Sequence, residues 1–144
     1  MSARLIGIGS PFGADRLGWW AVERLAPRLP PGVEPLCLDR PGPALLIHLE
    51  GLDRACLIDA ARGEKRPGHL YRLHPEDLTT APAAPSTHAL GLAEALALGA
   101  QLRLLPPRLL VLAVETGMED TPERPLERAW PALQAAVTDF FQRP

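Results

Sequence analysis

The chain has 144 residues, of which 47% are hydrophobic and 22% charged, and its formal net charge is −2. These values predict one globular domain over residues 1–144. Lys65 is the only lysine, so no basic surface for nucleic acid is expected. No apolar run approaches the roughly 18 residues that span a bilayer. We therefore expect a cytoplasmic protein with no membrane or nucleic-acid partner, in which Cys37 and Cys56 are buried, reduced thiols.

Short apolar runs alternate with helical patterns along the whole chain. The predicted strands are residues 4–8, 33–39, 55–60, 69–73 (a short strand near an edge) and 108–115. The predicted helices are residues 17–25, 43–52, 88–100 (capped by Ser86) and 125–141, which Pro131 starts or kinks. This alternation predicts βαβ units. The expected fold class is therefore α/β, a three-layer α/β/α domain with a mostly parallel twisted sheet flanked by helices.

Acidic residues stand where the predicted strands end. Asp15 follows the first strand, and Asp39, Asp59 and Glu115 end later ones. The carboxyl ends of parallel strands share one edge of the sheet, where open α/β sheets bind their ligands. His88 begins the helix predicted over 88–100. The sequence thus predicts a site at this edge, with Glu115 as a structural strand-end residue.

One interpretation of this edge is a Rossmann-like nucleotide-binding site. The segment "GIGSPFG" (7–13) lies between a strand and a helix, and Asp39 ends the second strand, where a ribose-binding acid is expected. The glycine spacing is one residue longer than the usual fingerprint. Asp15 and Asp59 would also repel a pyrophosphate. These charges disfavour the nucleotide alternative but leave it open.

A divalent cation fits the same charges better. Asp15, Asp59 and His88 would supply two oxygens and one nitrogen, a donor set suited to nickel, zinc, manganese or iron. Three protein ligands leave room for an outside ligand. The alternative for each residue alone is structural, with the acids capping turns and the histidine beginning a helix. Three further residues are candidates to line the cleft: Gly9, Ser10 and Asp39.

Six motifs carry a family resemblance, in order along the chain. They are "GIGSPFGADRLG", "LDRPGPALLIHLEGLDR", "CLIDAARGEKRPG", "STHALGL", "LAVETG" and "PLERAWPALQAAV". Together they resemble the hydrogenase maturation proteases, the endopeptidases that process the large subunit of nickel–iron hydrogenases. The resemblance spans essentially the whole chain.

The resemblance implies an enzyme and a site. In the family, an acid of the glycine loop, a second acid and a histidine engage the nickel already inserted into the hydrogenase large-subunit precursor. These positions fall on Asp15, Asp59 and His88, which are therefore the expected catalytic and metal-binding residues. The expected reaction removes the C-terminal extension of that precursor. The metal is expected to be nickel carried by the precursor, with another divalent metal as the alternative.

Three residues depart from the family pattern. Ser10 stands where an asparagine is usual, Ala14 replaces the first acid of an acid pair, and Arg16 replaces a glycine. A catalytically impaired homologue that only binds the precursor is therefore an alternative. For the cleavage itself, the simplest hypothesis is that the metal polarises the peptide carbonyl or activates water. Ser10 is interpreted as a turn residue, with nucleophile as the less favoured role.

Overall fold

A computed structural model describes residues 2–74, 86–87 and 92–143. Strands and helices alternate along these residues, as the apolar pattern predicts. In chain order the elements are β1 (Ala3–Gly9), the 3₁₀ turn η1 (Gly13–Arg16), α1 (Leu17–Leu25), η2 (Ala26–Arg28), β2 (Val33–Asp39), η3 (Gly42–Ala44), α2 (Leu45–Leu49), β3 (Arg54–Arg62), β4 (Leu70–Leu73), β5 (Ser86–Thr87), α4 (Leu92–Gln101), β6 (Arg108–Glu115) and α5 (Glu123–Gln142).

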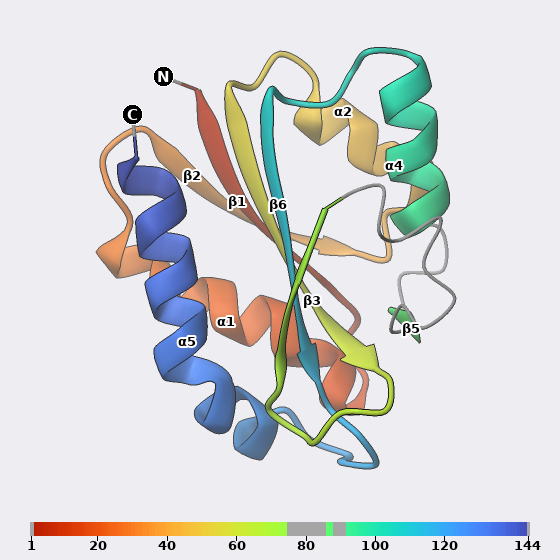
Figure 1. The fold of residues 1–144 in the computed structure, drawn as a ribbon, viewed down its shortest axis with the longest axis vertical. Helices are drawn as coiled ribbons and strands as arrows, with labels where there is room; N and C mark the ends of the chain where they lie inside the picture. The colour runs from red at the N-terminus through yellow and green to blue at the C-terminus, as the bar shows by residue number, and fades with distance from the viewer. Residues whose placement is uncertain (1, 75–85, 88–91, 144) are drawn as a thin grey trace.

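The strands form one twisted sheet in the order β2-β1-β3-β6-β4, and the short β5 pairs with β3 outside this path (Figure 1). The pairs β1–β2, β1–β3 and β3–β6 are parallel. The pairs β4–β6 and β5–β3 are antiparallel, and β4 is the predicted edge strand. With helices on both faces, this sheet confirms the predicted α/β/α fold class.

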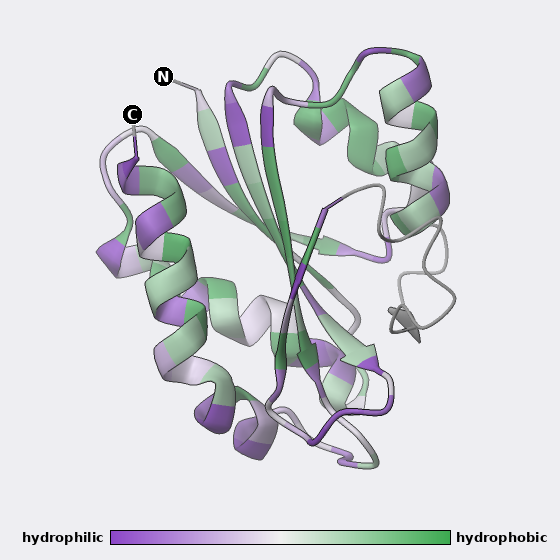
Figure 2. Cartoon of the chain, in the orientation of Figure 1, coloured by the Kyte–Doolittle hydropathy of each residue, from purple (hydrophilic) through white to green (hydrophobic). Residues whose placement is uncertain are grey.

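Two helical layers cover the sheet. Helices α1 and α5 lie on one face, and α2 and α4 on the other (Figure 1). Along the central strands hydrophobic residues predominate, whereas the outer turns of α5 are hydrophilic (Figure 2). Each fully buried aliphatic side chain contributes about 1.5–3 kcal/mol through the hydrophobic effect. The fully buried large side chains include Leu5, Ile6, Ile8, Leu17, Leu45, Leu49, Leu57, Ile58, Leu92, Leu96, Leu112 and Leu133.

The start of α1 packs directly on the strands. A Cβ atom built on Gly18 would lie 2.3 Å from the carbonyl oxygen of Ile8 and 2.6 Å from that of Ile58. Both distances are shorter than any real Cβ contact, so only glycine permits this approach. As a result, the turn that precedes α1 is held against the carboxyl ends of β1 and β3.

The burial predicted for one cysteine is wrong. Cys56, in the central strand β3, is fully buried, but Cys37 is exposed. Cys37 lies in β2, which forms the edge of the sheet next to β1 alone. An apolar run in an edge strand therefore does not place every side chain in the core.

The helices only partly follow their predicted bounds. The helix predicted over 43–52 is shorter, because the proline-rich start forms η3 and α2 spans only Leu45–Leu49. Ser86 lies in β5, and the start of the helix predicted over 88–100 falls outside the described residues, within which α4 spans Leu92–Gln101. Pro131 is exposed and lies inside the continuous α5, where it has no N–H to donate to the carbonyl of Glu127 one turn earlier. None of the helices in the described ranges is long and apolar enough to cross a membrane.

We predict that Gly18→Ala lowers the free energy of unfolding by about 3 kcal/mol, because the new methyl group meets two backbone carbonyls. Gly99→Ala is the matched control. It also lies in a helix, but its Cβ would meet the flexible tips of Leu46 and Leu105. We expect a change of less than about 1 kcal/mol there, since side chains can shift and alanine favours a helix. Urea unfolding of both variants tests this, and equal losses would contradict it.

Candidate functional site

The predicted site lies beside the end of β1, whereas β3 continues to Arg62, beyond its predicted end. β1 and β3 are paired in parallel, with Gly7 opposite Ile58, and Asp59 follows directly in β3. Asp15 lies in η1, which contacts β3. The chain continues from β1 toward β2 on one side and β3 lies on the other, so this is the point where the strand order reverses. Open α/β sheets bind ligands outside the carboxyl ends of strands at such a point.

Asp15 is held within a tight loop and is partly exposed. The Ser10 hydroxyl donates a hydrogen bond to Asp15 Oδ2 at 3.3 Å, and the Ser10 amide donates to the Asp15 carbonyl at 3.2 Å. The Asp15 amide in turn donates to the Phe12 carbonyl at 3.1 Å. The exposed Arg40 lies near this loop. Its pKa is raised, mainly by its hydrogen bond to Asp39 and to a smaller extent by the charge of Asp15.

Asp59 is fully buried in β3. Its Oδ1 accepts a hydrogen bond from the amide of Ala60 at 2.8 Å. A carboxylate inside a protein is costly unless hydrogen bonds, charges or a metal compensate it. Asp59 lies three residues before the end of β3, and η1, which carries Asp15, contacts this strand. Two neighbouring carboxylates are a donor set that suits a divalent cation.

The third predicted ligand, His88, lies outside the described residues. Thr87, to which it is covalently joined, pairs with Ala61, two residues after Asp59. Within the ranges that the structure describes, no group of three or more His, Cys, Asp or Glu side chains could hold a metal ion. The three-ligand site therefore stays a prediction.

Of the predicted cleft-lining residues, Gly9 and Ser10 belong to the loop of Asp15. A Cβ on Gly9 would lie 2.5 Å from the Asp15 carbonyl oxygen. Ser10 is buried, and its hydroxyl accepts a hydrogen bond from the Phe12 amide at 3.4 Å. These contacts support the interpretation of Ser10 as a turn residue. Asp39, opposite Gly9 in the register, is exposed.

The departure at Arg16 has a local explanation. Its Nε donates to the Gly13 carbonyl at 2.8 Å, and its guanidinium lies 5.0 Å from the centre of the Trp20 ring. The side chain is therefore held over α1 by a hydrogen bond and a cation–π contact.

Glu115 is a structural residue, as predicted. It is fully buried, and it accepts hydrogen bonds from Tyr71 Oη at 2.6 Å and from the amides of Gly63 and Gly117 at 2.8 and 2.9 Å. These bonds join the loops that follow β3 and β6 to β4. The partnership with Tyr71 could not be predicted, because it depends on the antiparallel register of β4 and β6. The only sequence signal is that Tyr71 is the sole tyrosine.

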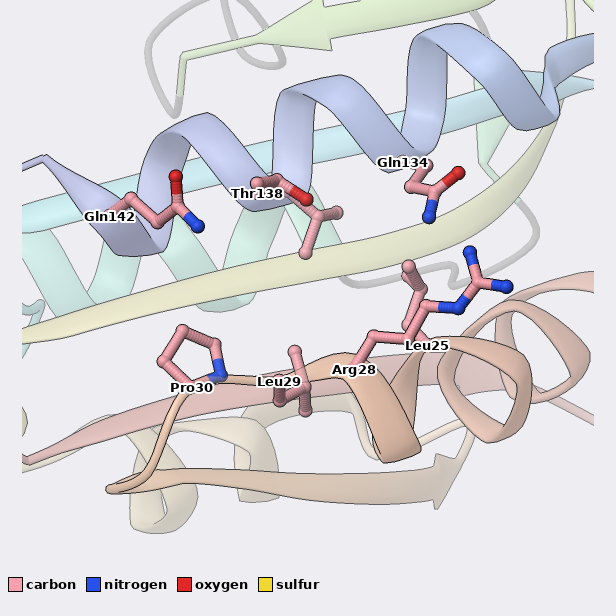
Figure 3. A pocket seen from close by; sticks show the side chains of 8 residues that line it. Leu25, Arg28, Leu29, Pro30, Gln134, Thr138 and Gln142 are labelled. Atoms are coloured by element: carbon pink, nitrogen blue, oxygen red, sulfur yellow. The ribbon is translucent and has the colours of Figure 1, made fainter.

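A pocket lies elsewhere, between α5 and the end of α1 (Figure 3). Its lining is mainly aliphatic and amide, with Arg28 as its charged residue. It offers no acid or nucleophile, so it does not compete with the carboxyl edge as a catalytic site. The lining residues are Leu25, Arg28, Leu29, Pro30, Gln134, Val137, Thr138 and Gln142.

The fold defines a doubly wound α/β protein with two acids, Asp15 and Asp59, near the point where its strand order reverses, and comparisons with known proteins give its family. The HycI model, described as hydrogenase maturation protease, matches residues 41–141. The chain therefore belongs to the hydrogenase maturation protease family, and it is an endopeptidase by family. A search of curated proteins finds no match.

Solved structures agree with this assignment. The hydrogenase maturating endopeptidase HybD from E. coli is 27% identical with a TM-score of 0.72, over 96% of this chain and 93% of that one. The solution structure of an endopeptidase from Escherichia coli is 25% identical with a TM-score of 0.75, over the same shares. The [NiFe] hydrogenase maturation protease HybD from Thermococcus kodakarensis shares the fold at 16% identity, with a TM-score of 0.72 over 99% and 100% of the two chains.

We predict that the contact between Tyr71 and Glu115 makes stability depend on alkaline pH. Burial, and then the bond to the Glu115 carboxylate, raise the pKa of Tyr71 from 10.0 to about 12. The unfolded chain therefore loses this proton first, so the stabilisation is complete below about pH 10 and is lost as the pH rises toward 12. Tyr71→Phe has no hydroxyl proton, so its free energy of unfolding should not show this alkaline decrease. Urea unfolding at about pH 9 and about pH 11.5 measures the free energy of unfolding of both proteins. The difference between wild type and Tyr71→Phe should be smaller at the higher pH, and an unchanged difference would contradict the prediction.

Proposed function

We propose that this chain removes the C-terminal extension of a nickel–iron hydrogenase large-subunit precursor and recognises the inserted nickel through Asp15, Asp59 and His88. The observation that carries the proposal is that Asp59 lies in β3 beside the end of β1, and that Asp15 lies in η1, the turn that follows β1 and contacts β3. The pairing of Thr87 with Ala61 supports the inclusion of His88. Several relatives are named as hydrogenase maturation proteases, two of them specifically for [NiFe] hydrogenases, which supports the substrate class.

In this mechanism the metal belongs to the substrate and marks a precursor that is ready to be cut. Two carboxylates and one imidazole suit nickel, and another divalent metal would be held by the same donors. The metal would polarise the peptide carbonyl or lower the pKa of a water molecule. Asp15 or Asp59 would hold the metal or accept the proton of the attacking water. Water adds to the carbonyl carbon, the C–N bond breaks, and the proton passes to the leaving amine.

We place this reaction in the cytoplasm. Both cysteines are free thiols, and Cys37 is exposed. Free exposed thiols persist in reducing compartments.

The alternatives make different predictions. A nucleotide-binding protein would bind dinucleotides and ignore the precursor, and family membership disfavours it. An impaired homologue would bind the nickel-loaded precursor without cutting it. This alternative is suggested by Ser10, Ala14 and Arg16, which depart from the family pattern.

We expect wild-type protein to shorten a nickel-loaded precursor and to leave a nickel-free precursor intact, as measured by mass spectrometry of the product. Asp15→Asn, Asp59→Asn and His88→Ala should each lower the rate at least about 100-fold, because each loses a ligand that acts in the reaction. The matched control is Asp139→Asn, an exposed aspartate on α5 paired with Arg143.

Circular dichroism should show all these variants folded. A precursor that wild type binds but leaves intact would identify a binding module instead. Normal processing by all three site variants would remove these residues from the mechanism.

Apolar side chains at the edge of the site also fit a protein substrate. Phe12 is 65% exposed in the loop after β1, and Met118 is 92% exposed in the loop after β6. The two loops meet, because a Cβ on Gly13 would lie 2.9 Å from the Asp120 carbonyl oxygen. The Asp15 amide bonds to the Phe12 carbonyl, so a precursor whose metal reaches Asp15 must cover Phe12.

We predict that Phe12→Ala raises KM for the nickel-loaded precursor about tenfold, equal to about 1.4 kcal/mol of binding energy, and leaves kcat unchanged. The control is Ile47→Ala, an equally prominent side chain that is 74% exposed on α2. Steady-state kinetics with purified precursor separates the two constants. Equal effects of the two variants would show that Phe12 does not contact the substrate.

A further inference from the structure

Ser10 is a buried polar residue next to the candidate site. Only 1% of its surface is exposed, although it directly follows β1 at the carboxyl edge. Its hydroxyl donates to Asp15 Oδ2 at 3.3 Å and accepts from the Phe12 amide at 3.4 Å. A serine hydroxyl has one proton to donate and lone pairs to accept, so both contacts are made at once.

The burial of this hydroxyl disfavours a nucleophilic role. A nucleophile needs access to the substrate carbonyl and a base to take its proton. The Ser10 hydroxyl is enclosed, and its proton lies toward a carboxylate that the proposed function assigns to metal recognition. The remaining role is to restrain the side chain of Asp15.

We propose that Ser10 is a positioning residue that orients the carboxylate of Asp15 toward the metal of the precursor. This inference rests on the proposed function. A carboxylate with free torsions pays an entropic cost when it binds a metal, and a hydrogen bond from a neighbouring group reduces that cost. Loss of such outer partners lowers metal affinity by about 10–100-fold in known sites. Because the bond is long, we expect the lower end of this range.

The loop backbone is braced independently of the hydroxyl. The Ser10 amide bonds to the Asp15 carbonyl at 3.2 Å, the Asp15 amide to the Phe12 carbonyl at 3.1 Å, and the Arg40 amide to the Gly9 carbonyl at 3.0 Å. Ser10→Ala therefore removes the hydrogen bond from the hydroxyl to the Asp15 carboxylate and leaves these three backbone bonds in place. The variant separates orientation of the side chain from formation of the turn.

The experiment compares affinities for nickel-loaded and nickel-free precursor by titration calorimetry, so it does not require turnover. For wild type we expect tighter binding of the loaded form. In Ser10→Ala this nickel-dependent gain should fall about tenfold, with affinity for the nickel-free form unchanged. In Asp15→Asn the gain should disappear, and Ser10→Ala in that background should cause no further loss. Ser10→Thr keeps the hydroxyl, so its preference for the nickel-loaded precursor should be close to that of wild type.

The outcomes separate the two proposals. If wild type shows no preference for the loaded precursor, the proposed function fails, and this inference fails with it. If wild type shows the preference and folded Ser10→Ala retains all of it, only this inference is overturned. An equal loss of affinity for both precursor forms would also overturn it, because a purely structural role predicts that result. If Ser10→Ala is poorly folded, Ser10→Cys keeps the volume with a weaker donor and should show the same selective loss.

Discussion

The contact between Gly18 and two strand carbonyls is the constraint on which the rest of the site depends. It brings the N-terminal end of α1 within van der Waals distance of β1 and β3 at the same time. The seven residues between β1 and α1 (10–16) then have little room, and they form a loop with η1 at its end. That loop places Asp15 beside the strand of Asp59. The site is thus a consequence of backbone packing, and glycine at position 18 is its precondition.

The acids of the carboxyl edge differ in how the protein stabilises them. Glu115 is surrounded by three strong donors within 2.6–2.9 Å, so its charge is satisfied by the fold and it ties three segments together. Asp39 forms an exposed ion pair with the adjacent Arg40, a contact that contributes little to stability. Asp15 and Asp59 lie closest to the point where the strand order reverses. Topology, more than charge alone, distinguishes the acids that can act on a ligand.

Patterns with strong periodicity predicted the fold well. Val33–Asp39, Arg108–Glu115 and Leu17–Leu25 have their predicted bounds, because apolar runs and flanking prolines mark them clearly. The exposure of Cys37 was missed because a strand's apolar run does not reveal whether it lies at an edge. The contact of Tyr71 with Glu115 was missed because strand register is not visible in one sequence. The neighbouring placement of the η1 turn and β3, which carry Asp15 and Asp59, was predictable, since it follows from parallel strand order.

The loop after β1 also explains how a glycine pattern typical of phosphate binding can serve a cation. A phosphate loop presents unpaired backbone amides to the anion. Here the amides of Ser10, Phe12 and Asp15 bond to acceptors within the loop itself. These three amides are therefore not free to bind a pyrophosphate, and the carboxylate of Asp15 adds negative charge at the same place. The same close helix–strand packing that shapes a nucleotide site here forms a loop with a partly exposed carboxylate, whose charge repels a phosphate and is compatible with the cation site that we propose.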